Sequence, residues 1–296
     1  MQASTITLPI TAFLAAITIS SHVLAAPSAI SFDFDGDGIP DRISYLGESG
    51  NLVVNYQSSS LGTKKQYSQK KFDECSSMGL YRIPGTSQIA IDGSCLSQGG
   101  QIYIHIYEWS KTDSDWCLVR EITGEKPDFH TQDFVGSRHV STVSGCPHIG
   151  DDGPYNYAPE STVTKRINQL FARLEIASKS SAEIKQYIQT IPFYEPLEIS
   201  EHLTKENVES ANNLAFYLSQ NRRSYDALQL LQAIVRNFPD RVVAKLNLAD
   251  AFWANDTLEP AKEMYASYVA QMKSLGKANL IPSWATDRCR AVKSSH

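Results

Sequence analysis

The chain has 296 residues, of which 42% are apolar and 20% are charged, and its formal net charge is −5 at neutral pH. This composition is typical of a folded protein, and it argues against a disordered chain and against a nucleic-acid-binding chain, which would be more basic. The length allows two modest domains.

The first 26 residues form a segment of their own. Residues 6–19 are nearly free of charge, and residues 23–26 supply small side chains before Pro27. This pattern predicts a signal peptide over residues 1–26 and a periplasmic or secreted protein, although no Lys or Arg precedes the apolar run. The run is short for crossing about 30 Å of hydrocarbon, and we expect no membrane span once the signal is removed.

An acidic loop follows the predicted cleavage site. Aspartates occupy positions 1, 3, 5 and 9 of the loop that begins at Asp33, and Gly36 permits a sharp turn at position 6. Four carboxylates would repel one another without a cation, and their hard oxygens suit Ca²⁺. The alternative is a plain Asp-Gly turn, which usually carries fewer acids. The predicted calcium ligands are the carboxylates of Asp33, Asp35, Asp37 and Asp41 and the backbone carbonyl of Ile39.

The sequence after this loop excludes an EF-hand, because position 12 is Ser44 and not Glu, and the next residues have no helical pattern. The Asp-x-Asp-Gly-Asp-Gly-x-x-Asp pattern before a strand resembles the calcium loops of FG-GAP and VCBS repeats, the blades of integrin-type propellers. The resemblance occurs once, and a single copy cannot close a propeller. It therefore implies the loop and its ion, and not the whole propeller fold.

Strands are predicted over most of the first half. Residues 43–56 read as a hairpin, and residues 101–109 and 116–122 read as a second one. In residues 101–109 the isoleucines occupy one face, while Tyr103, His105 and Tyr107 occupy the other. This alternation predicts half-buried antiparallel sheet within a β domain of residues 27–152. The aromatic face either packs under a neighbouring part of the protein or, together with Trp109, binds carbohydrate.

In an exported protein we expect the cysteines to form disulfides, because disulfides persist in oxidising compartments. Four of the five cysteines lie in the first half, and Cys289 stands apart near the end. Four cysteines allow three pairings. We favour Cys75 with Cys95 and Cys117 with Cys146, which leaves Cys289 free.

The histidines are the residues that a hydrolase would require. Three of them lie in the Gly- and Ser-rich region before a predicted linker at residues 151–159, and acids stand close to the last. The common hydrolase and nucleotide-binding motifs are absent from the sequence. We favour surface histidines and turn acids over a cell-wall or glycan hydrolase, whose candidate residues would be His130, His139, His148, Asp151 and Asp152.

The period of apolar residues changes to that of helices after Ser161. Residues 163–174 and 184–191 each carry one apolar stripe. Between residues 208 and 273 a set of apolar positions then recurs 34 residues apart, as where Leu214 and Ala215 recur as Leu248 and Ala249. This predicts two helical hairpins in an α-helical domain of residues 161–296, so that the whole chain belongs to the α+β class.

The 34-residue period resembles that of tetratricopeptide repeats (TPR), in which small residues let the two helices of a hairpin touch. The large aromatic residue expected near each start is replaced by Ala211 and Lys245. Two repeats are also few for a stable stack, so we expect support from the earlier helices, the tail or a dimer. The residues that match the TPR register are Leu214, Ala215, Ala227, Leu231, Leu248, Ala249, Phe252, Ala261 and Tyr265.

These features together favour an exported, non-enzymatic adaptor. A small antiparallel β domain with a structural calcium loop would precede a TPR-like solenoid that captures a protein or peptide. An envelope immunity or inhibitor protein falls within this class. The alternatives are the hydrolase and a calcium-dependent carbohydrate-binding protein using Tyr103, Tyr107 and Trp109. We expect neither nucleic acid nor a membrane among the partners.

Overall fold

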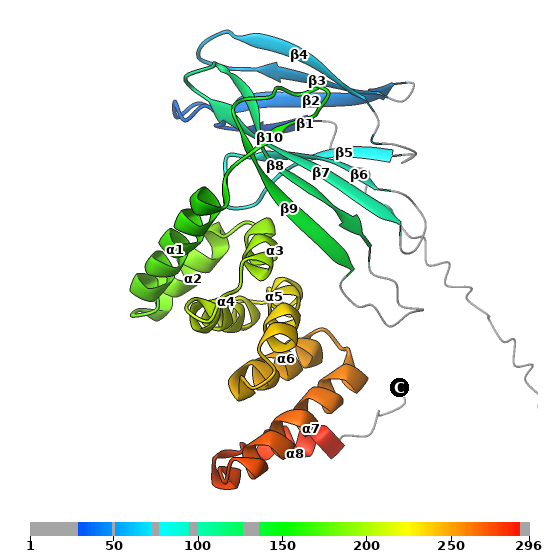
Figure 1. Cartoon of the computed structure of the whole chain (residues 1–296). Helices are drawn as coiled ribbons and strands as arrows, with labels where there is room; N and C mark the ends of the chain where they lie inside the picture. Colours follow the sequence, from blue (N-terminus) through cyan, green and yellow to red (C-terminus); the bar gives the residue numbers. More distant parts are fainter. Residues whose placement is uncertain are drawn as a thin grey trace, which may run out of the picture.

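The structure is a computed structural model that describes residues 29–48, 51–70, 72, 77–94, 100–126 and 136–290. The predicted signal peptide, Cys75, Cys95 and His130 lie outside the described residues. Strands fill the first half of the described chain and helices the second, so the predicted α+β class is confirmed (Figure 1). None of the described helices is long and apolar enough to cross a membrane.

The first sheet has four antiparallel strands in chain order. Its strand β3 alternates between buried and exposed side chains, so that Leu52, Val54 and Tyr56 all point into the core. The predicted hairpin of residues 43–56 is the β2–β3 pair of this sheet. The strands are β1 (Ala29–Phe32), β2 (Asp41–Glu48), β3 (Asn51–Gln57) and β4 (Lys64–Lys70).

The second sheet has six antiparallel strands in the order β10-β9-β8-β7-β6-β5. The second predicted hairpin is confirmed as the β7–β8 pair. The predicted linker at residues 151–159 is partly wrong, because Asn156 and Tyr157 pair with Ser144 and Val143 and complete this sheet. The strands are β5 (Ser77–Arg82), β6 (Ile89–Ser94), β7 (Gln101–Ser110), β8 (Asp115–Glu125), β9 (Ser137–Ser144) and β10 (Asn156–Tyr157).

The two sheets pack face to face around an aromatic core. The ring centroids of Tyr56 and Trp109 are 4.5 Å apart, and those of Phe34 and Trp116 are 5.2 Å apart. Tyr107 is fully buried in this core. The aromatic face of β7 therefore packs beneath the first sheet, which removes the surface that a carbohydrate-binding platform would need.

A disulfide joins Cys117 of β8 to Cys146, which follows β9, as the sequence predicted. Beside it the Leu118 N–H donates to the Pro147 carbonyl at 2.8 Å. The thiol of Cys289 is free, as predicted. The covalent link holds the turn after β9 against the sandwich and so fixes the path of the chain toward the helical half.

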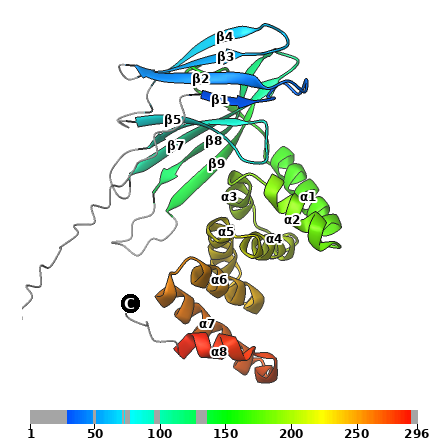
Figure 2. The ribbon, with the colours of Figure 1, turned by 180° about the vertical axis from the view of Figure 1, so that it is seen from behind.

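The other face of the six-stranded sheet supports the helices. Ile102, Ile104 and Ile106 point away from the first sheet and pack with Tyr194 and Leu197 of a short helix. Figures 1 and 2 show the remaining helices following in chain order, with α7 and α8 farthest from the sandwich. The helices are α1 (Glu160–Ala177), α2 (Ser181–Thr190), α3 (Tyr194–Glu201), α4 (Val208–Gln220), α5 (Ser224–Asn237), α6 (Val242–Ala254), α7 (Leu258–Ser274) and α8 (Ser283–Arg290), with a 3₁₀ turn at Ala278–Leu280.

The predicted 34-residue periodicity is present in the backbone. Helices α4 and α6 begin 34 residues apart, and so do α5 and α7. The turns match in detail: the side chains of Asn221 and Asn255 each donate to the carbonyl four residues earlier at 2.8 Å, and the next residues, Arg222 and Asp256, both have positive φ. The predicted TPR-register positions are all buried. The small side chains among them let the paired helices approach closely.

Helix α8 covers the far end of the helix stack. The guanidinium of Arg288 lies 4.9 Å from the ring centroids of both Trp253 and Trp284, and it donates to the carboxylate of Asp250 at 2.9 Å. The cation–π contact with Trp253 and the ion pair with Asp250 thus fix α8 on α6, and a hydrogen bond from Arg288 to the Tyr265 hydroxyl at 2.6 Å fixes it on α7. The predicted supporting role of the tail agrees with this position.

A buried network of charges joins the two halves. Glu198 of α3 is fully buried, and its carboxylate accepts from Thr142 of β9 at 2.6 Å and from Arg120 of β8 at 3.3 Å. Arg166 of α1 also pairs with Glu198 and with Glu195. Burial alone would lower the pKa of Arg166, but the two carboxylates outweigh it and raise that pKa. Each charged side chain in the network is therefore tolerated in the interior because its partners compensate its charge.

Replacing Glu198 tests this dependence. Glu198→Gln leaves Arg120 and Arg166 short of a counter-charge in the interior, and we expect a loss of about 3 to 5 kcal/mol in the free energy of unfolding. Urea denaturation followed by circular dichroism measures it. Glu175→Gln, at an exposed position of α1, is the control and should change stability little. Equal stability of the two variants would contradict the role of the network.

Candidate functional site

The acidic loop connects β1 to β2, and the structure brings three of its four aspartates together. Asp33, Asp35 and Asp41 each place one carboxylate oxygen within 4.8 Å of the others. Asp37 instead turns toward the hydroxyl of Ser60, in the β3–β4 turn. Ile39 is 47% exposed, and its N–H donates to Asp37 at 2.7 Å. The structure thus gathers part of the predicted ligand set.

Backbone groups hold the carboxylates in place. Asp33 accepts from the N–H groups of Gly36 at 2.7 Å and Gly38 at 2.9 Å, and both glycines have positive φ, which a side chain would strain. Asp41 is fully buried and accepts from the Phe34 N–H at 2.9 Å. The loop geometry therefore follows from the spacing of Gly and Asp in the sequence.

The electrostatics of the loop favour a cation. Asp35 is buried, and desolvation raises its pKa; the nearby carboxylates of Asp41 and Asp37 raise it further, while the hydroxyl of Ser58 opposes the change. The ammonium of Lys111, at the β7–β8 turn, lies 3.2 Å from the position that a Cβ on Gly36 would take. Three carboxylate oxygens this close together, with the pKa of Asp35 raised, fit Ca²⁺, which would be held by Asp33, Asp35 and Asp41.

The candidate histidines are dispersed. His139 binds Glu201 at 2.8 Å near the start of β9, whereas His148 lies beyond the end of that strand, 3.7 Å from Asp115 and 3.8 Å from Asp151. Asp152 pairs with Lys70 at 2.7 Å instead. The structure therefore places His148 beside Asp151, one of the predicted hydrolase pairs, whereas His139 and Asp152 lie with other partners.

His105, on the aromatic face of β7, is the one buried histidine among the described residues. His105 is 6% exposed and lies 3.4 Å from Glu121 of β8 and 3.3 Å from the hydroxyl of Tyr107. Glu121 also accepts from the hydroxyl of Tyr157 at 2.7 Å. The hydrogen bond from His105 lowers the pKa of Glu121, and the Tyr157 hydroxyl adds to this against the opposing effect of burial. This group supports the sheet from within.

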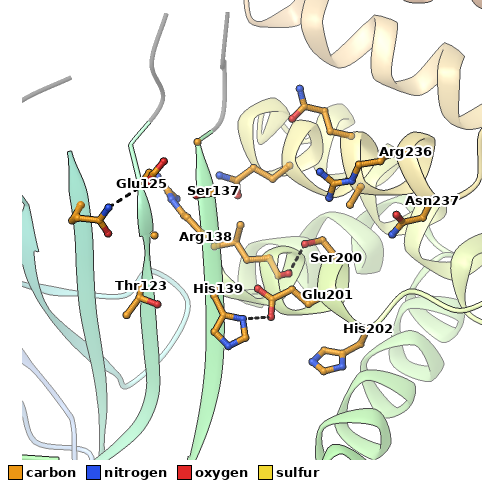
Figure 3. A pocket seen from close by; sticks show the side chains of 17 residues that line it. Thr123, Glu125, Ser137, Arg138, His139, Ser200, Glu201, His202, Arg236 and Asn237 are labelled. Carbon is orange, nitrogen blue, oxygen red and sulfur yellow. Dashed lines mark hydrogen bonds and ion pairs between the residues drawn. The ribbon is translucent and has the colours of Figure 1, made fainter. Parts of the chain in front are cut away.

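A cavity of about 880 Å³ lies between the six-stranded sheet and the helices (Figure 3). Strands β8 and β9 form one wall, and helices α3 and α5 form the other. Figure 3 shows Arg138 and His139 on the strand side and Arg236 and Asn237 on the helix side. The size is that of a ligand pocket, and polar side chains dominate its lining. Residues that reach it include Gln101, Glu125, Ser137, Ser200, Gln229 and Gln232.

A second hollow of about 580 Å³ lies against α5, α6 and α7. Gln232 and Arg236 line both hollows, so the two adjoin at these side chains, and together they are called the binding groove hereafter. Leu248, Phe252 and Met264 supply apolar surface in its second part, beside the acidic side chains of Glu259 and Glu263. The binding groove thus combines a polar half beside the sheet with a more apolar half on the repeated helices.

Sequence reasoning did not single out this groove. Among the predicted site residues, His139 lines its first part, and Leu248 and Phe252 line its second. The signal that could have pointed to it is the polar stretch on α5, where Gln229, Gln232 and Arg236 share one side of a helix at spacings of three and four. The opposite wall comes from a distant strand and has no local signal.

No protein-family model matches the chain, and no curated protein matches it closely enough to count as a relative. The resemblances to TPR repeats and to FG-GAP loops therefore rest on the residues of the chain and on their geometry alone.

Calcium should stabilise the protein through the acidic loop. At a hundredfold excess of free Ca²⁺ over its Kd, we expect a gain of about 2.7 kcal/mol in the free energy of unfolding. Asp35→Asn should raise stability in chelator, because the charged form of Asp35 is disfavoured in the fold, and should also reduce the gain from Ca²⁺. Thermal unfolding of the unaltered protein, of Asp35→Asn and of the control Asp256→Asn, each in Ca²⁺ and in EDTA, checks both expectations. An equal gain in all three proteins would contradict the site.

Glu121 should make stability depend on pH. Its pKa is lower in the folded chain than in the unfolded chain, so its contribution is complete above the unfolded value and is lost as the pH falls through the folded value. Between about pH 6 and pH 3, Glu121→Gln should therefore lose less stability than the unaltered protein. Urea midpoints across this range measure the difference; parallel curves for the two proteins would refute it.

Proposed function

We propose that this protein is an exported, non-enzymatic adaptor that captures a protein or peptide partner in the binding groove. The observation that carries the proposal is a pair of adjoining hollows, which share Gln232 and Arg236 of α5 and together extend from the sheet wall to the repeated helices. A groove with a polar half and an apolar half suits a peptide, whose backbone needs hydrogen bonds and whose side chains need apolar contacts. The predicted periplasmic or secreted location belongs to this proposal.

The helices support a TPR-like assignment. Two helix pairs repeat at 34 residues with matching turns, and α8 covers their far end as a cap would. Recognition of a protein by such helices is a property that the resemblance implies. An envelope immunity or inhibitor protein, which blocks another protein by occupying it, fits within this function.

Calcium has a structural role in this proposal. The acidic loop connects β1 to β2 and touches the β3–β4 turn through Ser58, Ser59 and Ser60. It therefore lies within the first sheet, whereas the binding groove lies between the second sheet and the helices. An ion in the loop would stabilise the sandwich without contacting the captured partner.

The alternatives have weaker support. The described histidines that a hydrolase would use, His139 and His148, are each engaged with acids of their own at separate places. Tyr107 and Trp109, which a carbohydrate platform would expose, are buried between the sheets. These observations favour binding through the groove.

Site-specific photo-crosslinking tests the proposal. A benzophenone amino acid is placed at Gln232 or Met264 in the groove, or at the exposed Lys179 between α1 and α2 as a control. The variants are irradiated in envelope extract of the source organism, with Ca²⁺ and with EDTA, and the products are identified by mass spectrometry. We expect one protein to be crosslinked from both groove positions and not from Lys179.

The outcomes separate the hypotheses. Crosslinking that is equal at all three positions, or absent from both groove positions in proteins that remain folded, would refute capture in the groove. Crosslinking that persists in EDTA supports a structural role for calcium, whereas loss in EDTA would make the acidic loop part of the binding mechanism.

A further inference from the structure

Strand β9 has an open edge that faces the polar half of the binding groove. Its Val140 N–H donates to the carboxylate of Glu201 at 3.1 Å, and its Thr142 carbonyl accepts from the Ala158 N–H at 2.9 Å, so both residues direct backbone groups away from β8. Alternate residues of a strand direct these groups to the same side. The N–H and C=O of Arg138 therefore also point outward, toward the cavity that Arg138 lines.

The described strands leave this stretch of edge unpaired. On that side β10 is the one described strand beside β9, and it pairs with Val143 and Ser144, at the opposite end. Next to Arg138 the wall is made by α3 and α5, with the cavity of about 880 Å³ between. An unpaired edge is a template for another strand, and proteins usually cover or block such edges.

The helix wall offers a donor that faces the same space. Gln229 of α5 is 8% exposed and lines the cavity, and its side-chain nitrogen makes no hydrogen bond to the described part of the chain. A buried amide without a partner is costly, and native proteins rarely leave one. A backbone carbonyl of an occupant would satisfy it once the Gln229 side chain turned its nitrogen toward the cavity.

The cavity holds two acidic side chains, Glu125 and Glu201, and two arginines, Arg138 and Arg236, and the acids have partners where the arginines form no ion pair within the described part of the chain. Glu201 is engaged by His139 at 2.8 Å, and Glu125 accepts from Gln101 at 3.4 Å. The guanidinium groups of Arg138 and Arg236 form no ion pair with another described residue, and Figure 3 shows them on opposite walls. Guanidinium groups bind carboxylates with paired hydrogen bonds.

We propose that an extended, acidic segment of the partner adds to β9 as a further strand. Its backbone pairs with that of Arg138, and one of its carbonyls accepts from the Gln229 amide. One of its carboxylates lies between Arg138 and Arg236. This rests on the proposed capture of a peptide or protein and names the chemistry of the captured segment. The adjoining apolar half of the groove would take the next residues of that segment.

Peptide selection tests the proposal without the natural partner. Random linear dodecapeptides displayed on phage are selected against the mature chain, and the enriched peptides are synthesised for fluorescence anisotropy. We expect enrichment of Asp or Glu at one position. Arg236→Glu should weaken binding by about tenfold or more, because it replaces a charge-assisted contact with repulsion. Arg236→Lys should recover part of the affinity, and Arg173→Glu, on an exposed turn of α1, should leave it unchanged.

Backbone methylation separates strand addition from other modes of binding. Glu201 already accepts from the Val140 N–H and Ala158 already donates to the Thr142 carbonyl, so the added strand pairs chiefly at Arg138. N-methylation should therefore lower the affinity at the peptide residue that pairs with Arg138 and change it little at the residues on either side. Gln229→Leu should weaken peptide binding while leaving thermal stability equal or higher, because the amide lacks a partner in the free protein. Amide hydrogen exchange at Arg138 should slow when the peptide binds.

Three results would overturn the inference. The first is an N-methylation profile without any sensitive position, and the second is affinity that Arg236→Glu leaves unchanged. The third is a selection that enriches no acidic peptide over the background. If the selected peptides instead lose affinity on Met264→Glu, strand addition fails while peptide capture on the repeated helices stands. The crosslinking from Met264 decides the proposed function independently.

Discussion

One buried carboxylate determines how the two halves of this protein are joined. Glu198 of α3 is surrounded by Arg120 of β8, Thr142 of β9 and Arg166 of α1, so three elements besides its own must be in place before its charge is compensated. A buried charge without its partners is strongly destabilising. The sandwich and the helices are therefore held in one arrangement. Because the walls of the binding groove come from both halves, that arrangement also determines the shape of the groove.

The elements that could be predicted from sequence are those whose pattern is local. The alternation in β7 and the apolar stripe of α1 reflect which face of each element is buried, and both were predicted. Helix α3 was not, because it is short and contains Pro196, and its stability comes from packing Tyr194 and Leu197 on the sheet. Strand β10 was missed for the same reason, since its two residues are strand only by pairing with β9.

The acidic loop and the binding groove differ in the same respect, because the residues of the loop are close in sequence and those of the groove are not. The acidic loop could be located because its ligands and glycines lie within nine residues of sequence, from Asp33 to Asp41. The sequence could not indicate that Ser60 would draw Asp37 aside, or that Lys111 would lie above Gly36, because both come from other turns. The binding groove depends entirely on such distant pairings: Arg138 and Arg236 face one cavity only because α3 places α5 beside β9.

The cap formed by α8 has a consequence for assembly. A stack of similar helix pairs with a bare end can accept another pair, or the end of a neighbouring chain, and contacts of this head-to-tail kind do not close on themselves and can propagate into fibres. Here the sandwich terminates one end of the stack, and Trp284 and Arg288 terminate the other. The number of helix pairs in the described stack is thus fixed by the covering elements at its two ends.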